Sequence, residues 1–184
     1  MEKIDEIYGL YLDSTQAFYL HKTKLETDQI KSSEKLNVSI SYLDTCKYIF
    51  GIGDPNNPSS IILHECSQLD LKKRNDKGGM NYKIAAHLLV TSIFHYWEDY
   101  YRNLMASSIG ISKSELKLDI FGDLRYFRQS IIHHRAISLP EMEKCKILKW
   151  FKEGDEIILT EEQIQQVIYN VKTELNNITE KYNC

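Results

Sequence analysis

The sequence contains few of the residues that interrupt helices, with only 3 prolines and 8 glycines among its 184 residues. Proline and glycine are the least favourable residues inside a helix. Hydrophobic residues make up 42% of the chain and charged residues 27%, a balance typical of globular proteins and not of disordered ones. A chain of this length buries a core without disulfides or metal ions. We therefore expect residues 1–184 to form a single all-α domain.

Cysteine is also scarce, and the four that occur lie far apart in the chain: Cys46, Cys66, Cys145 and Cys184. No two of them have zinc-ligand spacing, and they form no dense disulfide framework. The sequence also lacks the basic start and apolar run of a signal peptide, and no apolar stretch is long enough to cross a bilayer. These absences predict reduced thiols, a cytoplasmic location and no contact with a membrane.

No excess of positive charge is present, since the formal net charge is −3. This argues against a protein that coats nucleic acid through bulk electrostatics, although a small basic site is compatible with it.

Two short motifs are only weak evidence for a binding site. The pair Gly51 and Gly53 lacks the third glycine of a dinucleotide site and indicates a turn. His64, Glu65 and Cys66 are adjacent, so their side chains do not converge on one metal ion.

Helical periodicity runs through most of the chain. It is clearest at the carboxyl end, where a helix is predicted over 161–181 with one buried face. That face consists of Ile164, Val167, Ile168, Val171, Leu175 and Ile178. Three further helices are predicted, over 82–108, over 113–136 and, with a looser pattern, over the first 30 residues.

Local start signals support these helices. A Ser or Thr followed three residues later by Glu or Gln is a capping box. The sequence holds three such pairs, Thr160 with Gln163, Ser112 with Glu115, and Ser138 with Glu141, where Pro140 suits a first helical turn. Gly110 is placed to end the helix over 82–108.

The segment 37–80 breaks the helical pattern and is predicted as an irregular insertion that can contain short strands. It includes the alternating stretch NVSISY, the loop-like GIGDPNNPSS and the turn-like KKRNDKGG. The stretch EGDEIILT at 153–160 predicts a short extended connection before the last helix.

The stretch LRYFRQSIIHHRAIS at 124–138 places arginines and histidines in a predicted helix. At about 100° per residue, Arg128 falls inside the apolar arc, Arg135 points the same way and Arg125 lies at the border. His133 and His134 lie about 140° and about 120° from Arg128, on opposite sides. The apolar arc is made by Ile120, Leu124, Phe127, Ile131 and Ile132.

A charge on a buried face is costly unless it is paired or lies beside a wet cleft. Two interpretations follow. In the first, Glu98 or Asp99 neutralises Arg128, and the histidines are ordinary surface residues. In the second, the helix packs against a second copy of itself, and arginine and histidine from both chains meet in a cleft.

The stretch LRYFRQSIIHHRA resembles the signature of the HEPN superfamily (higher eukaryotes and prokaryotes nucleotide-binding domains). In that signature an arginine followed by a polar residue precedes a histidine by four to six intervening positions. Here Gln129 follows Arg128, and four residues separate Arg128 from His133. The upstream FHYWEDYYRNLM resembles the helix that precedes the motif in that family, so the likeness covers 82–136. Many members have asparagine in place of Gln129, and His134 is an alternative to His133 as the family histidine.

The resemblance implies an all-α HEPN-like bundle that acts as a metal-independent endoribonuclease on single-stranded RNA, without a cofactor. It also implies a homodimer with the site at the dimer interface. The residue types suit this reaction, because histidine exchanges protons near neutral pH and arginine's forked guanidinium holds phosphate.

The resemblance also implies a role for each residue of the motif. His133 is the acid or base, with His134 in reserve, Arg128 holds the phosphate, and Gln129 orients its neighbours. The surrounding residues have supporting roles, with Arg125 and Arg135 as a basic rim and Glu98 positioning Arg128.

By analogy, such an enzyme serves as a toxin or in defence against phage, with an antitoxin or other regulatory partner. Two other interpretations of the sequence stay open. One is a non-catalytic HEPN-like helical dimer that binds a partner protein or a nucleotide. The other is a structural dimer in which Glu98 neutralises Arg128.

Overall fold

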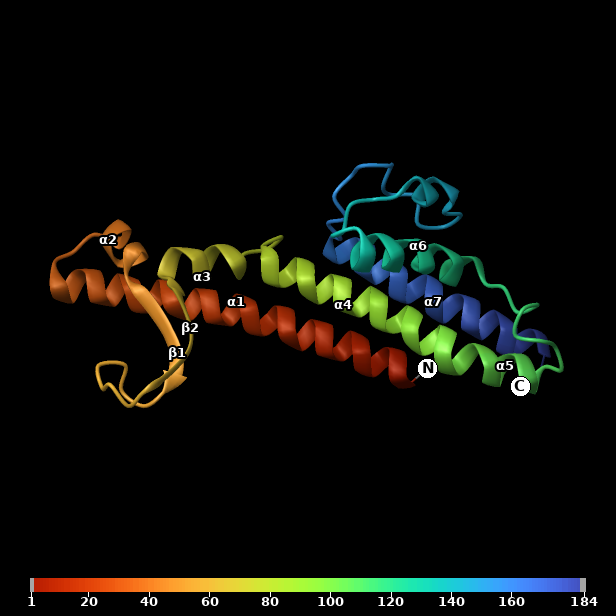
Figure 1. Cartoon of the computed structure of the whole chain (residues 1–184), viewed down its shortest axis with the longest axis horizontal. Helices are drawn as coiled ribbons and strands as arrows, with labels where there is room; N and C mark the ends of the chain where they lie inside the picture. The colour runs from red at the N-terminus through yellow and green to blue at the C-terminus, as the bar shows by residue number, and fades with distance from the viewer. Residues whose placement is uncertain (1, 183–184) are drawn as a thin grey trace. The chain divides into compact units, whose positions relative to one another are not determined.

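The computed structural model describes residues 2–182, which are 66% helix and 8% strand overall (Figure 1). The mainly helical prediction is confirmed, whereas assignment to the HEPN bundle stays a prediction. The elements in chain order are α1 (Glu2–Leu36), α2 (Ile40–Thr45), β1 (Lys47–Ile52), β2 (Ile61–Ser67), α3 (Gln68–Arg74), α4 (Met80–Tyr96), the π-helical turn η1 (Trp97–Tyr101), α5 (Arg102–Ser108), α6 (Asp119–His133), the 3-10 helix η2 (Pro140–Lys144) and α7 (Glu161–Tyr182).

Backbone contacts divide the chain into two compact units. Unit 1 comprises residues 1–12 and 83–184, and unit 2 comprises residues 13–82. Helices α1 and α4 each contribute residues to both units. That the chain is a single domain stays a prediction.

Helix α7 of unit 1 follows its prediction closely. The capping box is formed, since the Thr160 backbone N–H donates to Gln163 Oε1 at 2.9 Å and the Gln163 N–H donates to Thr160 Oγ1 at 3.2 Å. All six residues of the predicted apolar face are buried. They join one core with α4 and α6, which includes Val90, Ile120 and Leu124.

The helix predicted over 82–108 is present as three consecutive segments, because the π-helical turn η1 lies between α4 and α5. The amphipathic pattern over 82–108 groups Leu88, Tyr100 and Leu104 with Ile93 and Trp97 as apolar positions of one helix, but the first three are exposed. A π-helical turn contains more residues per turn than an α-helix and therefore shifts the face that follows it. Apolar residues also surround much of α4, so their spacing alone does not define one face.

Helix α6 is shorter at both ends than the predicted 113–136. The capping box of Ser112 and Glu115 is half formed: the Glu115 carboxylate accepts the Ser112 backbone N–H at 2.8 Å, but the Glu115 N–H donates to the Ser112 carbonyl and not to its hydroxyl. The pair closes an isolated turn, and the helix begins only at Asp119 after an extended Leu118. The third capping signature, at Ser138, precedes the 3-10 helix η2. The sequence signal is local and serves a turn as well as a helix.

The loop after α6 is attached to the helix by the buried carboxylate of Asp123. Its oxygens accept three backbone N–H groups, from Lys146 at 2.9 Å, Ile147 at 2.7 Å and Leu148 at 2.8 Å. Burial, together with the neighbouring Asp123 carboxylate, raises the pKa of the Cys145 thiol to about 12. Cys145 is therefore a neutral, buried thiol that helps to fill the core.

Unit 2 contains the antiparallel hairpin of β1 and β2. The short strands allowed for within 37–80 are present, but NVSISY is not one of them, because Ser39 caps α2 there. The segment is less irregular than predicted, since it also contains α2 and α3, and the start of the turn-like KKRNDKGG is the last turn of α3. The hairpin has an irregular register between Phe50 and Gly51. A Cβ at Gly51 would lie 2.4 Å from the Ile61 carbonyl oxygen, so the close approach requires glycine.

A buried polar network connects the helices of unit 2. The Gln29 amide donates to Asp44 and to Gln68, both at 2.9 Å, and accepts from Lys72 at 3.0 Å. Lys72 also forms an ion pair with Asp44 at 2.6 Å. Hydrogen bonds from Lys72 and Gln29 hold the pKa of the Asp44 carboxyl below its ordinary value. These partners lie far apart in sequence, so no local pattern indicates the network.

Within residues 2–182, no helix is both long enough and apolar enough to cross a membrane. Cys46, Cys66 and Cys145 are free thiols. Cys184 lies outside the described residues.

Candidate functional site

Helix α6 exposes one polar face on the side opposite the core. Arg125, Gln129, Ile132 and His133 are exposed, and Arg128 is half-buried. By helix geometry, Arg128 and His133 bound this face about 140° apart, with the other three between them. We call these five residues the basic face of α6.

In the described part of the chain, Arg128 has no counter-charge. Its guanidinium carbon lies 6.0 Å from the centroid of the Phe94 ring, at the outer limit of a cation–π contact. Within residues 2–182, no hydrogen bond or ion pair involves Arg128. A half-buried guanidinium in this state has lost part of its hydration without a compensating partner. It is therefore disposed to bind an anion from outside the chain.

Glu98 does not pair with Arg128, contrary to expectation. Its carboxylate binds Arg102 at 2.9 Å and Lys113 at 3.0 Å. Burial alone would raise the pKa of the Glu98 carboxyl, but the hydrogen bonds from Lys113 and Arg102 outweigh it and hold this pKa below its ordinary value. Arg102 lies four residues after Glu98, which is a favoured spacing for an ion pair on a helix. The spacing in the sequence therefore already favours Arg102 over Arg128 as the partner of Glu98.

Asp99, the other proposed partner of Arg128, forms an ion pair with His95 at 2.7 Å. Neither acidic residue of the preceding helix therefore neutralises Arg128. The interpretation of Arg128 as a residue satisfied within the chain loses its basis.

The two candidate histidines lie at the carboxyl end of α6. His133 is its last residue and His134 its C-cap, and both are exposed. The His134 backbone N–H donates to the Ser130 carbonyl at 3.1 Å, but in the described part of the chain neither imidazole has a hydrogen-bonding partner. Both rings are exposed and open to hydrogen bonding by solvent or a ligand. One copy of α6 nevertheless directs Arg128 and His133 to different borders of its face.

Arg135 lies beyond the end of the helix, so the helical projection that aligned it with Arg128 does not apply. Arg135 and Ala136 have φ angles of 53° and 61°, in the left-handed region. Such a conformation costs a residue other than glycine roughly 1–2 kcal/mol. The Ala136 N–H returns to the Ser130 carbonyl at 3.0 Å, which satisfies the helix end. Strained backbone often marks functional positions.

This turn is held in place from a distant part of the sequence. The Ala136 carbonyl accepts the Ile157 N–H at 2.8 Å, and Ile137 forms an antiparallel bridge with Glu156. The extended connection predicted at 153–160 is present in part, as a turn at 153–154 followed by the isolated bridge at Glu156. On the other side, His87 Nε2–H donates to the Ile157 carbonyl at 2.8 Å. His87 was not identified by the sequence analysis, because only the fold brings it to this strand.

His87 makes stability depend on pH. Burial, helped by the nearby charge of Lys83, lowers its pKa below the ordinary value of 6.5, against the raising effects of the Ile157 carbonyl and Glu156. The unfolded chain then takes up a proton more readily, so this contribution to stability is complete above about pH 6.5 and falls as the pH drops below it. We expect urea unfolding of His87→Gln to lose less free energy than the natural chain between pH 7.5 and pH 5.5. Equal losses for both proteins would contradict this.

The apolar arc predicted for α6 is correct for most of its members. Ile120, Leu124 and Phe127 are fully buried, but Ile132 is 55% exposed in the middle of the basic face. It lies about 120° from Ile120 around the helix, so the predicted arc was too wide. Arg125 lies over the neighbouring Tyr126, with its guanidinium carbon 5.1 Å from the ring centroid.

No group of three His, Cys, Asp or Glu side chains within residues 2–182 is arranged to hold a metal ion. A scan against protein-family models, a search of curated proteins and a search of solved structures each found no match to the chain. The HEPN resemblance stays a prediction that depends on the motif residues.

Proposed function

We propose that this chain is an endoribonuclease of the HEPN type that cleaves single-stranded RNA as a homodimer. The main support is the state of Arg128, a half-buried arginine with no acidic partner within residues 2–182. A phosphate group of RNA would supply the missing charge, and a guanidinium binds phosphate through two parallel hydrogen bonds.

The proposed reaction is an internal transfer of the phosphodiester. The ribose 2′-oxygen attacks the adjacent phosphorus while its proton passes to an imidazole. The bond from phosphorus to the 5′-oxygen breaks, and the leaving oxygen takes a proton from an imidazolium. His133 is the first candidate for these proton transfers and His134 the second, and Arg128 stabilises the charge that develops on the phosphate oxygens. Gln129, Arg125 and Arg135 would contact the RNA around this centre.

A second copy is part of this proposal for a geometric reason. Arg128 and His133 lie about 140° apart on one helix, so a single α6 cannot aim both at one phosphate. If two α6 helices meet across a two-fold axis, Arg128 of one copy faces residues of the other. The exposed Ile132 between them would provide the apolar centre of such a contact.

Function as a toxin or a defence effector, with a regulatory partner, is a further part of the proposal and follows from the resemblance alone. The competing proposal is a non-catalytic dimer that binds a protein or a nucleotide. It differs in one measurable respect, since it leaves RNA intact.

The proposal is tested by incubating the purified protein with labelled single-stranded RNA in EDTA. We expect fragments ending in 2′,3′-cyclic phosphate, and no cut at a position that carries a single 2′-deoxy sugar. Light scattering should give a dimer that Ile132→Asp dissociates, with loss of cleavage. The control Leu88→Asp changes an exposed aliphatic residue elsewhere in unit 1 and should leave the dimer intact. Intact RNA would refute the enzyme, and cleavage by a monomer would refute the shared site.

A further inference from the structure

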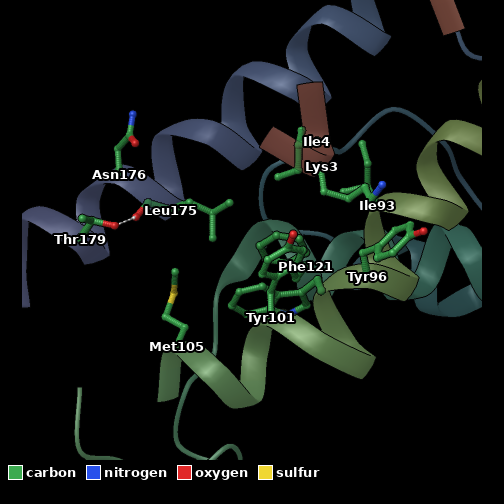
Figure 2. A pocket seen from close by; sticks show the side chains of 11 residues that line it. Lys3, Ile4, Ile93, Tyr96, Tyr101, Met105, Phe121, Leu175, Asn176 and Thr179 are labelled. Atoms are coloured by element: carbon green, nitrogen blue, oxygen red, sulfur yellow. Dashed lines mark hydrogen bonds between the residues drawn. The ribbon is translucent and has the colours of Figure 1, made fainter. Parts of the chain in front are cut away.

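Unit 1 contains an apolar cavity of about 210 Å³ whose lining includes none of the five residues of the basic face of α6 (Figure 2). Apolar side chains from the start of α1, from α4, α5 and α7 form most of its wall, including Ile4, Ile93, Met105 and Leu175. An engineered cavity of about 150 Å³ in another protein remains dry and binds benzene. The volume here is therefore sufficient for a small organic ligand.

The cavity is continued along the helices by a second one of about 270 Å³. Tyr101, Met105 and Thr179 line both cavities. Leu104, Ile109 and Ile178 line the second cavity at its far end. The shared residues place the two cavities side by side. Joined, they would make an elongated apolar path between α5 and α7, which suits a chain-like molecule better than a compact one.

One end of this path carries a positive charge. The Lys3 ammonium lies 5.5 Å from the centroid of the Tyr96 ring, and both residues line the first cavity, on the side away from Met105 and Thr179 in Figure 2. Lys3 forms an ion pair with Glu6. An ammonium group has three N–H donors, so two are left for a ligand.

Two further polar residues of the first cavity, Thr179 and Asn176, carry no charge that would attract or repel a ligand. The Thr179 hydroxyl donates to the Leu175 carbonyl at 3.0 Å, and Asn176 is exposed at the rim. Two aromatic rings of the wall contact each other, because Trp97 stacks on Phe121 with ring centroids 4.0 Å apart and planes 8° apart. Flexible Met105 adapts readily to an alkyl chain.

We propose that this path binds an unbranched aliphatic monocarboxylate, with its alkyl chain between α5 and α7 and its carboxylate at Lys3. The elongated shape sets the preference for a chain, and the single cation at one end sets the preference for an acid. The site uses none of the basic face of α6. The inference therefore stands or falls independently of RNA cleavage.

Calorimetric titration with octanoate, decanoate and dodecanoate tests the proposal on the full chain. We expect binding at one site per chain, with a dissociation constant that falls about fourfold for each added methylene until the path is full. Leu175→Trp should abolish binding by filling the first cavity. Leu88→Trp places the same bulk on an exposed position of α4 and should leave binding unchanged.

Two further variants separate the parts of the proposal and do not disturb buried residues. Lys3→Gln should weaken alkanoates at least about fivefold and leave n-alkanols of equal length unaffected. Thr179→Trp changes an exposed residue where the two cavities meet, so octanoate should still bind and dodecanoate should lose its advantage.

Four results would overturn the inference. The first is that no alkanoate binds, and the second is that alkanoates bind equally well to folded Leu175→Trp and Thr179→Trp. The third is that Lys3→Gln weakens the binding of acids and alcohols equally. The fourth is that no alkanoate binds and Thr179→Trp dissociates a dimer. The last result would assign the path to a second copy of the chain.

Discussion

Arg128→Ala is expected to lower the rate of RNA cleavage by a factor of about 10²–10³. The guanidinium would act on charge that grows as the phosphate reacts, so its loss should appear in the chemical step. Arg128→Lys should recover little activity, because an ammonium lacks the planar pair of donors. Single-turnover cleavage of labelled single-stranded RNA in EDTA measures both effects.

Thermal unfolding of the same variant distinguishes a catalytic arginine from a structural one. A half-buried charge without a partner does not stabilise the fold, so Arg128→Ala should unfold at the same temperature as the natural chain or higher. A structural arginine would give the reverse, a lower midpoint with cleavage retained. Lys117→Ala removes one exposed positive charge elsewhere in unit 1 and should change neither measurement.

Variants of the two candidate histidines are tested in the same cleavage assay. His133→Ala should lower the rate by about 10²–10⁴, because it removes the proposed proton-transfer group. If His134→Ala has this effect instead, the second histidine is the reacting one. His95→Ala is the matched control, since His95 is exposed on another helix and pairs with Asp99. Full activity in both His133→Ala and His134→Ala would contradict the proposed chemistry.

Asp123→Ala is expected to destabilise the fold by about 3–5 kcal/mol, because it leaves three backbone N–H groups without their acceptor. For a chain of this size that corresponds to a fall of roughly 10 °C in the midpoint of thermal unfolding. Asp119→Ala is the matched control on the same helix. Asp119 is half exposed and pairs with an exposed Lys146, so its loss should cost at most about 1 kcal/mol.

The thiol of Cys145 reports on the same change. In the natural chain it is buried with a pKa of about 12, so iodoacetamide should modify it very slowly at pH 8. Asp123→Ala removes the neighbouring negative charge and loosens the loop, so the peptide that contains Cys145 should be alkylated faster. If Asp123→Ala and Asp119→Ala are equally stable, the carboxylate does not anchor the loop.

The elements best predicted from the sequence are those whose local and long-range signals agree. For α7, the capping box at Thr160 and the 3.6-residue spacing from Ile164 to Ile178 both indicate the same helix, and the structure contains it. At Ser112 the local signal exists without an apolar face to continue it, and only a turn forms. The start of α6 therefore could not be read from capping alone.

Other features depend on contacts that a linear pattern does not contain. Gln29 meets Lys72, and Asp123 meets the backbone of Leu148, only after the helices have packed. For the candidate site, the motif residues themselves were readable, but their environment was not. The absence of a partner for Arg128 became visible only when Glu98 was found with Arg102 and Lys113.

The π-helical turn η1 changes which face of the continuous helix formed by α4, η1 and α5 points inward. A wider turn advances the side chains by a smaller angle per residue, so a stripe begun on α4 does not continue straight onto α5. On α4 the inward side chains, such as Val90, fill the common core, and on α5 Met105 packs against that core and also borders the apolar path. Shortening this turn by one residue would swing every side chain of α5 by about a quarter of a revolution. Met105 would then leave the wall of that path while the core below it kept its composition.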